Sequence, residues 1–558
     1  MRIFLTKAFQ LSLAVLILQG WAHADPGDSL QSYNYIHHNL NVIQYFNKEV
    51  LKRYHDKWNS SDRVVIAHFG DSHVQPDIYP GAVRKELQSA RGNGGFGMTF
   101  PYSTVRTYSM IDYRSVHTGT WLYSKSIEPK PKLPLGVSGA TARTFDPHAT
   151  FALHFKKPYP SGPLIARIFC KMEPRSFDFV LRSGGQETLV EVGSQAPAKP
   201  VEILLNTPDS IIELKLVKKK ENQNAFEFYG MSLEDPGRTG VVHHCLGIGG
   251  SKYGSLLEQA LLEEQLPALA PDLVILDFGT NDILYQNAVP LDLKTQIDGV
   301  IRKVKRAAPE ATILLTSAQD MYRRDQNITA SMDFSDLVRQ VAREQQCLMY
   351  DWYWVAGGPE TMVKWRDHEL ARKDMIHLTI QGYELKGRLL GQAIIEAVKN
   401  YDNAPDSVLV SLEPFRRRKN FPDTLRNDSI QKMVAQRNAR DLSVIRHQIK
   451  KGESLKVIAK HYHVKVEDIR RDNGLPNNRI IEGKYLIIHP GKIQAGKSSV
   501  STSADESSQK YLTHLIKSGE TLSEIAEQYK VSVTQLKQLN GLRSSNIRAG
   551  KTLKIKPL

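Results

Sequence analysis

The C-terminal part of the chain contains an internal repeat. Residues 451–455 recur in similar form at 518–522, and residues 482–486 recur at 549–553, both at an offset of 67 residues. The motif Asn-Gly-Leu at 473–475 recurs at 540–542 with the same offset. A constant offset without gaps indicates two copies of one folding unit. We therefore expect small modules at 446–490 and 512–557, joined by a flexible linker at 491–511 that is rich in Ser, Gly and Lys.

The N-terminus has the pattern of a signal peptide. Arg2 and Lys7 precede a short apolar run at 11–18, and the small residues Ala22 and Ala24 follow. This pattern predicts removal of residues 1–24 and export of the rest, to the periplasm, the cell wall or the exterior. An uncleaved anchor is the alternative, although the run is short for a bilayer span. No later stretch is long and apolar enough to predict stable membrane insertion.

Charge and cysteine content narrow the partners. The 558 residues include 74 Lys and Arg against 59 Asp and Glu, which gives a net charge of +15. Because no nucleic-acid motif accompanies this charge, we expect no nucleic-acid partner and favour a polyanionic cell envelope. Three widely spaced cysteines form neither a disulfide framework nor a zinc motif, so we expect three buried thiols, with a single bridge as the alternative.

The middle of the chain shows two different patterns of hydrophobic residues. Apolar runs of the buried-strand type alternate with helical periodicity before residue 104 and after 241, which predicts an α/β fold with a doubly wound parallel sheet. Between them, short alternating segments predict an inserted all-β sandwich. The predicted boundaries are 25–104 and 241–401 for the α/β domain, 105–240 for the insertion and 402–445 for a linker. We also expect residues 30–58 to be helical.

Three short motifs carry the chemistry. Gly70-Asp71-Ser72 and Gly279-Thr280-Asn281-Asp282 each follow a predicted strand, and Asp374 and His377 precede the last long helix. Each motif alone is as compatible with a turn or a helix cap. Because parallel strands gather their carboxyl ends at one edge, the motifs together supply a nucleophile, an oxyanion donor and an aspartate-oriented base.

These motifs resemble those of the SGNH (GDSL-type) hydrolases. The resemblance implies a three-layer fold and a serine esterase that needs no metal or cofactor. Its catalytic residues would be Ser72, Asp374 and His377, with Ser72, Gly250 and Asn281 as oxyanion donors. Gly250 is preferred over a rival glycine motif at 136–139 because it directly precedes the resumed α/β pattern. His73 stands where the family often has leucine.

The C-terminal repeats resemble LysM modules, which are small βααβ units that bind N-acetylglucosamine-containing glycans, chiefly peptidoglycan. The resemblance implies glycan contacts near residues 478–480 and 546–547 and at two matching loops: Gly452, Glu453, Ser454 and Leu455, and Gly519, Glu520, Thr521 and Leu522.

The domain order as a whole resembles the bacterial peptidoglycan O-acetylesterases, whose insertion is like a carbohydrate-binding module. The expected function is removal of O-acetyl groups from peptidoglycan through an acyl-enzyme on Ser72. The alternatives are an acetyltransferase, an esterase acting on another envelope or extracellular polysaccharide, and a non-catalytic peptidoglycan-binding protein.

Overall fold

The computed structural model divides the chain into two units, Met1–Arg426 and Asn427–Leu558. It describes residues 33–157, 162–195, 199–285, 288–417 and 445–488 except 451, 463, 474 and 476; between 512 and 555 it describes 512–515, 522, 525–526, 531, 533–542, 544 and 552–555. The predicted signal peptide and the linker at 491–511 lie outside the described residues.

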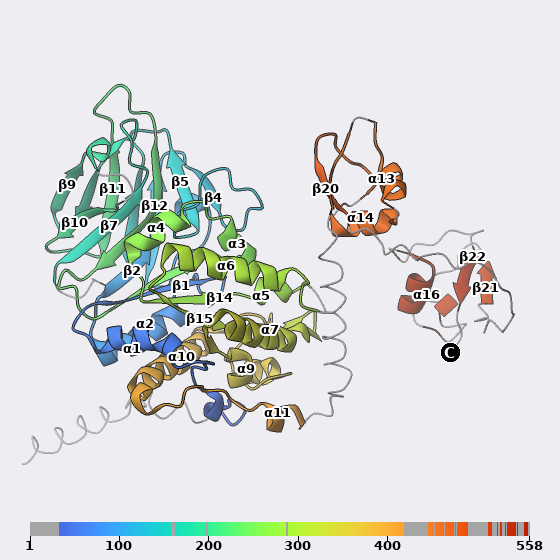
Figure 1. Ribbon diagram of the computed structural model, residues 1–558. Helices are drawn as coiled ribbons and strands as arrows, with labels where there is room; N and C mark the ends of the chain where they lie inside the picture. The colour runs from blue at the N-terminus through green and yellow to red at the C-terminus, as the bar shows by residue number, and fades with distance from the viewer. Residues whose placement is uncertain are drawn as a thin grey trace, which may run out of the picture. The chain divides into compact units, whose positions relative to one another are not determined.

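The first unit is built around a five-stranded parallel sheet (Figure 1). Its strand order is β13 (Val241–Gly247), β1 (Val64–Gly70), β14 (Leu273–Asp277), β15 (Thr312–Thr316) and β18 (Leu348–Tyr350). Gly70 lies level with Gly247 on one side and Asp277 on the other, so β13, β1 and β14 end at the same edge.

Helices cover both faces of this sheet. Val64 and Ile66 of β1 pack in one core with α1 (Glu49–Asn59), α2 (Tyr79–Arg91) and α10 (Ile380–Lys399). Ala67 and Phe69 pack in a second core with α4 (Leu262–Leu269), α6 (Leu293–Ala307) and α7 (Ala330–Gln345). Successive strand residues point to opposite faces, so a strand whose residues are all apolar is buried on both sides. The predicted doubly wound, three-layer fold is confirmed.

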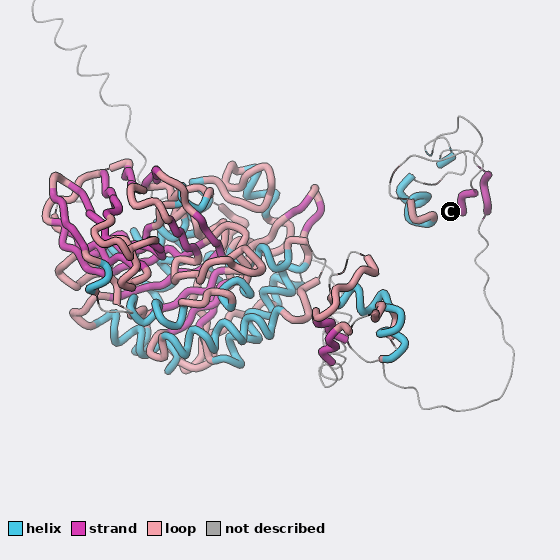
Figure 2. Tube along the Cα trace, turned by 90° about the horizontal axis from the view of Figure 1, so that it is seen from above, coloured by secondary structure: helices cyan, strands magenta, loops and turns pink. Residues whose placement is uncertain are grey.

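An all-β insertion separates β1 from β13. One sheet has the order β10-β7-β12-β5-β4 with β2 paired to β12, and the other has the order β3-β6-β11-β8-β9. Phenylalanine rings join the two sheets, as where Phe151 of β6 meets Phe228 of β12 with ring centroids 4.8 Å apart. Figure 2 shows these strands gathered at one side of the first unit. The strands are β2 (Gly95–Thr99), β3 (Tyr113–Thr118), β4 (Leu122–Lys125), β5 (Ala140–Thr144), β6 (Thr150–Phe155), β7 (Leu164–Cys170), β8 (Asp178–Ser183), β9 (Gln186–Val190), β10 (Val201–Leu205), β11 (Ile211–Val217) and β12 (Phe226–Glu234).

The insertion starts earlier than residue 105, so that predicted boundary is wrong. β2 pairs with β12 of the insertion, although its sequence is rich in glycine. Gly95 and Gly97 have φ values of +132° and +91°, and a Cβ on Gly97 would lie 2.5 Å from the carbonyl oxygen of His243. Glycine is required for this close approach, and glycine is also what hid the strand from a propensity argument.

Two further segments differ from expectation. The helix expected within residues 30–58 is limited to α1, and the chain before it is irregular apart from the 3-10 helix η2 (His38–Leu40). Gln44 and Tyr45 instead form bridges with Met349 and Val408. Residues 402–412 are therefore not a free linker, because Val408 bridges to Tyr45, next to the residue that bridges to β18, and Leu412 is buried. The three cysteines are buried and unpaired, as expected.

The second unit contains the repeats. In the first copy, β19 (Ile445–Gln448) pairs antiparallel with β20 (Tyr485–Ile488), and α13 (Leu455–His461) and α14 (Val466–Asp472) lie between them in sequence. In the second copy, β21 (Leu512–Leu515) pairs with β22 (Thr552–Ile555), preceded by α16 (Val533–Leu539). Each copy has its own small apolar core. Among the helices that the structure describes, none has the length and apolar character to cross a membrane.

Candidate active site

Ser72 lies on a tight turn at the carboxyl end of β1. The amides of Val74 and Gln75 both donate to the carbonyl oxygen of Asp71, which closes the turn. A Cβ on Gly70 would lie 2.3 Å from the Val74 side chain, so only glycine fits where the strand ends. The turn leaves Ser72 partly exposed at the edge of the sheet, where doubly wound folds place their sites.

Ser72, His377 and Asp374 form a continuous chain of hydrogen bonds. The Ser72 Oγ lies 2.9 Å from the His377 Nε2, and the His377 Nδ1 lies 2.8 Å from the Asp374 Oδ2. The other carboxylate oxygen of Asp374 accepts the amides of Ile376 and His377, both at 2.9 Å. Such an arrangement fixes the imidazole tautomer and leaves its Nε2 free to accept the serine proton.

Asp374 is held in its ionised form. Burial alone would raise the pKa of its carboxyl. The amides of His377 and Ile376 and the imidazole of His377 outweigh this effect and lower the pKa below its ordinary value. The carboxylate is thus charged at neutral pH, as a group that stabilises an imidazolium must be.

The loop that carries His377 is supported from behind. The Gln319 side chain donates to the carbonyl oxygen of Ile376 at 2.5 Å, and Gln319 in turn accepts from the indole of Trp352. The Arg372 amide donates to the carbonyl oxygen of His377 at 2.8 Å. The base therefore sits on a loop whose position is fixed by a buried polar network.

The glycine loop after β13 lies directly beside Ser72. A Cβ on Gly249 would be 3.6 Å from the Cβ of Ser72, and Gly250 has a φ of +89°. Within the described ranges, the amides of Ser72 and Gly250 have no hydrogen-bond acceptor. The rival glycines differ, because Gly136 donates its amide to the Thr141 hydroxyl and Gly139 donates to the Gly136 carbonyl. The geometry thus favours Gly250 as the second backbone donor.

Asn281 belongs to the short helix α5 (Thr280–Ile283) after β14 and is bound to the Ser72 turn. Its side-chain amide donates to the Asp71 Oδ2 at 3.0 Å and to the carbonyl oxygen of Ser251 at 3.1 Å. Asp71 is buried, and burial raises the pKa of its carboxyl to about 7. Asn281 is therefore placed beside Ser72 and Gly250, although both of its amide hydrogens are engaged.

Gln75 was not singled out from the sequence, yet it joins three segments around Ser72. Its Oε1 accepts the amide of Gly249 at 2.6 Å, and its Nε2 donates to the carbonyl oxygen of Tyr108 at 2.7 Å. The side chain is fully buried. It ties the glycine loop and the first loop of the insertion to the Ser72 turn. A single glutamine three residues after a serine gives no sequence signal of this role.

The predicted glycan-contact residues of the first repeat serve its fold. Leu455 is 1% exposed and packs in the module core, and the Ser454 hydroxyl caps α13 by accepting from the Val457 amide. The Glu453 carboxylate accepts the Lys450 amide at 2.7 Å and lies 2.8 Å from His447. Gly452 and Ser454 remain exposed and Glu453 is partly exposed, so a glycan contact at 452–455 stays a prediction.

In the second repeat, Leu522 is likewise buried in the module core. The predicted contact residues Gly519, Glu520 and Thr521 lie outside the described residues, as do 546–547. Across the part of the chain that the structure describes, no group of three or more His, Cys, Asp or Glu side chains is arranged to hold a metal ion.

Comparison with known families identifies both units. Residues 209–385 match the GDSL-like lipase/acylhydrolase family, and residues 447–489 and 514–556 match the LysM domain. The first match includes Asn281, Asp374 and His377 but not Ser72, which the structure brings to them from the preceding strand. The chain thus carries a GDSL-type hydrolase domain of the SGNH fold, the domain of an ester hydrolase, and two LysM domains.

Individual relatives cover parts of the chain. A solved structure of a peptidoglycan O-acetylesterase is 20% identical with a TM-score of 0.52, and the match covers 66% of this chain and 99% of that chain. At this identity, the likeness shows the fold. An autolysin of Enterococcus faecalis is 35% identical over 107 residues, and a probable autolysin of Staphylococcus aureus, SsaALP, is 37% identical over 109 residues. These matches cover 19% and 20% of this chain but only 14% and 39% of the two relatives.

Proposed function

We propose that the chain is a cell-wall esterase that removes O-acetyl groups from peptidoglycan. The observation that carries the proposal is the hydrogen-bonded chain from Ser72 through His377 to Asp374, at 2.9 and 2.8 Å. A serine joined to an oriented imidazole is the arrangement of nucleophilic acyl transfer. The likeness in fold to a peptidoglycan O-acetylesterase and the LysM domains point to an ester on the wall.

In the first half of the reaction, the Ser72 Oγ attacks the acetyl carbonyl carbon while its proton passes to the His377 Nε2. The tetrahedral intermediate collapses, the bond to the sugar oxygen breaks, and His377 returns the proton to that oxygen. The sugar leaves with a free hydroxyl, and Ser72 keeps the acetyl group as an ester. Asp374 stabilises the imidazolium that forms between the two proton transfers.

In the second half, His377 takes a proton from water, and the resulting hydroxide attacks the acetyl-Ser72 carbonyl. Acetate leaves, and the proton returns to the Ser72 Oγ. In both halves the oxyanion would lie between the amides of Ser72 and Gly250. Asn281 would join them by exchanging its bond to the Ser251 carbonyl, while its bond to Asp71 keeps the side chain in place. One such donor is worth about 10²–10³ in rate.

The LysM domains would bind the glycan of the wall and keep the esterase near its substrate. Autolysins of Enterococcus faecalis and Staphylococcus aureus match the chain over about a fifth of its length, which supports a place at the cell wall or outside the cell. Two linked modules raise the effective concentration for the second contact, so the pair would bind more tightly than either copy alone.

The proposal is tested by acetate release from purified O-acetylated peptidoglycan. We expect the wild type to release acetate and Ser72→Ala to lose at least about 10³-fold in kcat/KM. Ser194→Ala, which removes an exposed hydroxyl from the insertion, is the matched control. Release by Ser72→Ala at the wild-type rate would contradict the mechanism. Transfer of acetyl groups onto added glycan, without net release of acetate, would contradict hydrolysis as the function.

A further inference from the structure

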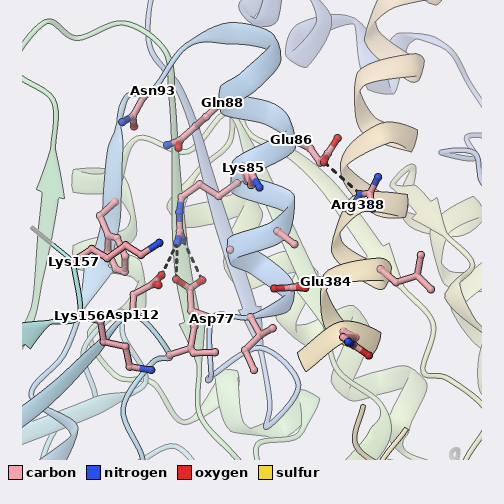
Figure 3. A pocket seen from close by; sticks show the side chains of 18 of the residues that line it. Asp77, Lys85, Glu86, Gln88, Asn93, Asp112, Lys156, Lys157, Glu384 and Arg388 are labelled. Carbon is pink, nitrogen blue, oxygen red and sulfur yellow. Dashed lines mark hydrogen bonds and ion pairs between the residues drawn. The ribbon is translucent and has the colours of Figure 1, made fainter. Parts of the chain in front are cut away.

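A large groove runs along the first unit between its helices and the insertion. Its volume is about 1180 Å³, above the range of about 300–1,000 Å³ that is common for small-molecule sites. Figure 3 shows α2 and α10 along one wall and Lys156 and Lys157 on the opposite wall. The helix wall of the groove is lined by Ile78, which precedes α2, and by Ala82 and Lys85 of α2. Gln381 and Glu384 of α10 line the same wall.

The walls of the groove carry free charges of both signs. Lys156 and Lys157 project from the end of β6, and Glu384 projects from the facing helix (Figure 3). Lys85 adds a further cation on α2. All four side chains are exposed, and none forms an ion pair within the ranges that the structure describes. A groove of this kind fits a ligand that carries both carboxylate and ammonium groups.

The floor of the groove adds no free cation to this charge pattern. The Arg84 guanidinium binds both carboxylate oxygens of Asp77, at 3.1 and 2.8 Å, and both side chains are buried. Arg84 also lies over the ring of Phe96, with its guanidinium carbon 4.6 Å from the ring centroid. Arg84 also lies 3.7 Å from the carboxylate of the half-exposed Asp112, so its guanidinium is engaged by two carboxylates. The unpaired charges at the walls are therefore the groups left to select a ligand.

One end of the groove adjoins the catalytic elements. Asp77 follows Ser72 by five residues, and the Ile111 amide of the insertion donates to the carbonyl oxygen of Pro76 at 2.7 Å. On α10, Glu384 lines the groove while its neighbour Tyr383 hydrogen-bonds His73 beside the catalytic base. The groove and the proposed catalytic residues are thus built from the same segments of the chain.

We propose that this groove binds the stem peptide of the peptidoglycan strand whose acetyl group is at Ser72. The proposal rests on the proposed function, and it names the part of the substrate that the groove takes. Stem peptides carry free carboxylates, which would pair with Lys156 and Lys157, and a free amino group, which would pair with Glu384. A purely anionic wall polymer fits less well, because Glu384 would repel it.

The test compares one O-acetylated glycan in two forms, with its stem peptides and after their removal by an amidase. Acetate release gives kcat/KM for each form, and the ratio of the two values reports the peptide contribution. We expect the wild-type ratio to exceed one. We expect the double variant Lys156→Gln/Lys157→Gln to lower that ratio by about three- to tenfold, in keeping with two exposed ion pairs. We expect Glu384→Gln, which removes one pair, to lower it by about two- to fivefold.

The control is Lys218→Gln/Lys220→Gln, which removes the same charge from exposed lysines of the insertion outside the groove. It should keep the wild-type ratio. A wild-type ratio of one would overturn the proposal. An equal loss of kcat/KM on both substrates in the groove variants would also overturn it, and would instead indicate that the groove binds an anionic polymer or the glycan itself. A decrease of the ratio in the control variant as large as in the groove variants would also overturn the proposal.

A second measurement keeps this proposal separate from the proposed function. Calorimetry of the full-length Ser72→Ala chain with a free stem tetrapeptide needs no esterase activity. We expect binding that weakens in Lys156→Gln/Lys157→Gln. Absence of peptide binding alongside normal acetate release would reject the groove site alone, whereas peptide binding without acetate release in the wild type would reject the esterase alone.

Discussion

His73 stacks on His377, the proposed general base, with ring centroids 5.2 Å apart and an interplanar angle of 29°. The hydroxyl of Tyr383 hydrogen-bonds the His73 Nδ1 at 2.9 Å. Burial, and then the proximity of His377, hold the pKa of His73 well below its usual range, so this ring stays neutral. A neutral, hydrogen-bonded imidazole can occupy a buried position without an opposite charge beside it.

Asp374→Asn tests the role of the orienting carboxylate. The amide oxygen of asparagine can keep both backbone bonds now made by the Asp374 Oδ1, so we expect the loop to remain folded. The new NH₂ group would face the His377 Nδ1 and favour the tautomer with its proton on Nε2, which cannot accept the serine proton. We expect kcat for p-nitrophenyl acetate to fall by about 10²–10⁴ with little change in Tm. An unchanged kcat would exclude a role for this carboxylate.

Gln75→Leu tests the two side-chain hydrogen bonds by which Gln75 joins the glycine loop to the insertion. The variant leaves the Gly249 amide and the Tyr108 carbonyl without their partner, which costs about 1–3 kcal/mol per buried group. We expect a lower Tm and a loss of at least about tenfold in kcat, with a smaller change in KM, because the Gly250 donor moves. Gln75→Glu keeps the acceptor for Gly249 and should recover part of kcat.

The control for Gln75→Leu is Gln340→Leu, which removes an exposed glutamine from α7. It should leave both kcat and Tm near the wild-type values. If Gln75→Leu lowered Tm but kept the wild-type kcat, Gln75 would support only the fold and would not position the oxyanion donor.

Asp71 predicts a pH dependence of stability. Its pKa is raised by burial from 3.8 to about 7, so between these pH values the folded protein keeps a proton that the unfolded chain has lost. Stability from this group is therefore highest below about pH 4 and decreases as the pH rises toward 7, by at most about 4 kcal/mol.

Asp71→Asn removes this titration, so the decrease in Tm from pH 5 to pH 8 should be smaller than in the wild type. The exposed Asp292→Asn is the control and should keep the wild-type slope. Equal slopes in wild type and Asp71→Asn, measured by thermal unfolding at both pH values, would show that Asp71 is ionised throughout this range.

The equivalent core leucines of the repeats predict how the tail binds. Leu455 and Leu522 are each 1% exposed in the core of a small module. Leucine to alanine in such a core costs about 2–5 kcal/mol, which is enough to unfold a marginal module. We expect each single variant to pellet less with purified sacculi and the double variant to lose pelleting, while Leu257→Ala in the first unit pellets normally. Normal pelleting by the double variant would show that the LysM domains do not hold the chain to the wall.

Much of the architecture could be predicted from sequence because its signals are local. Buried strands appear as apolar runs, and the motifs at residues 70–72, 279–282 and 374–377 sit where such strands and loops end. The repeat at an offset of 67 residues predicts the two C-terminal modules. The meeting of Ser72 and His377 was inferred from the rule that parallel strands end at one edge, and the distance of 2.9 Å agrees with it.

Other features depend on contacts between distant segments and leave no local signal. β2 is a strand because it pairs with β12. The segment 402–412 packs on the first unit, where Val408 bridges to Tyr45. Gln75 and the groove arise where the insertion meets the hydrolase helices, which no single segment reveals. Conversely, Leu455 matched a binding motif because the fold of the module requires it in the core.

The most direct test of the account is covalent labelling of the nucleophile. Diisopropyl fluorophosphate reacts with a serine hydroxyl that a neighbouring base has activated, and peptide mapping by mass spectrometry locates the adduct. We expect one phosphorylated serine, Ser72, in the wild type, and a strong decrease in labelling in His377→Ala. Labelling of a different serine, or equal labelling of Ser72 without His377, would contradict it.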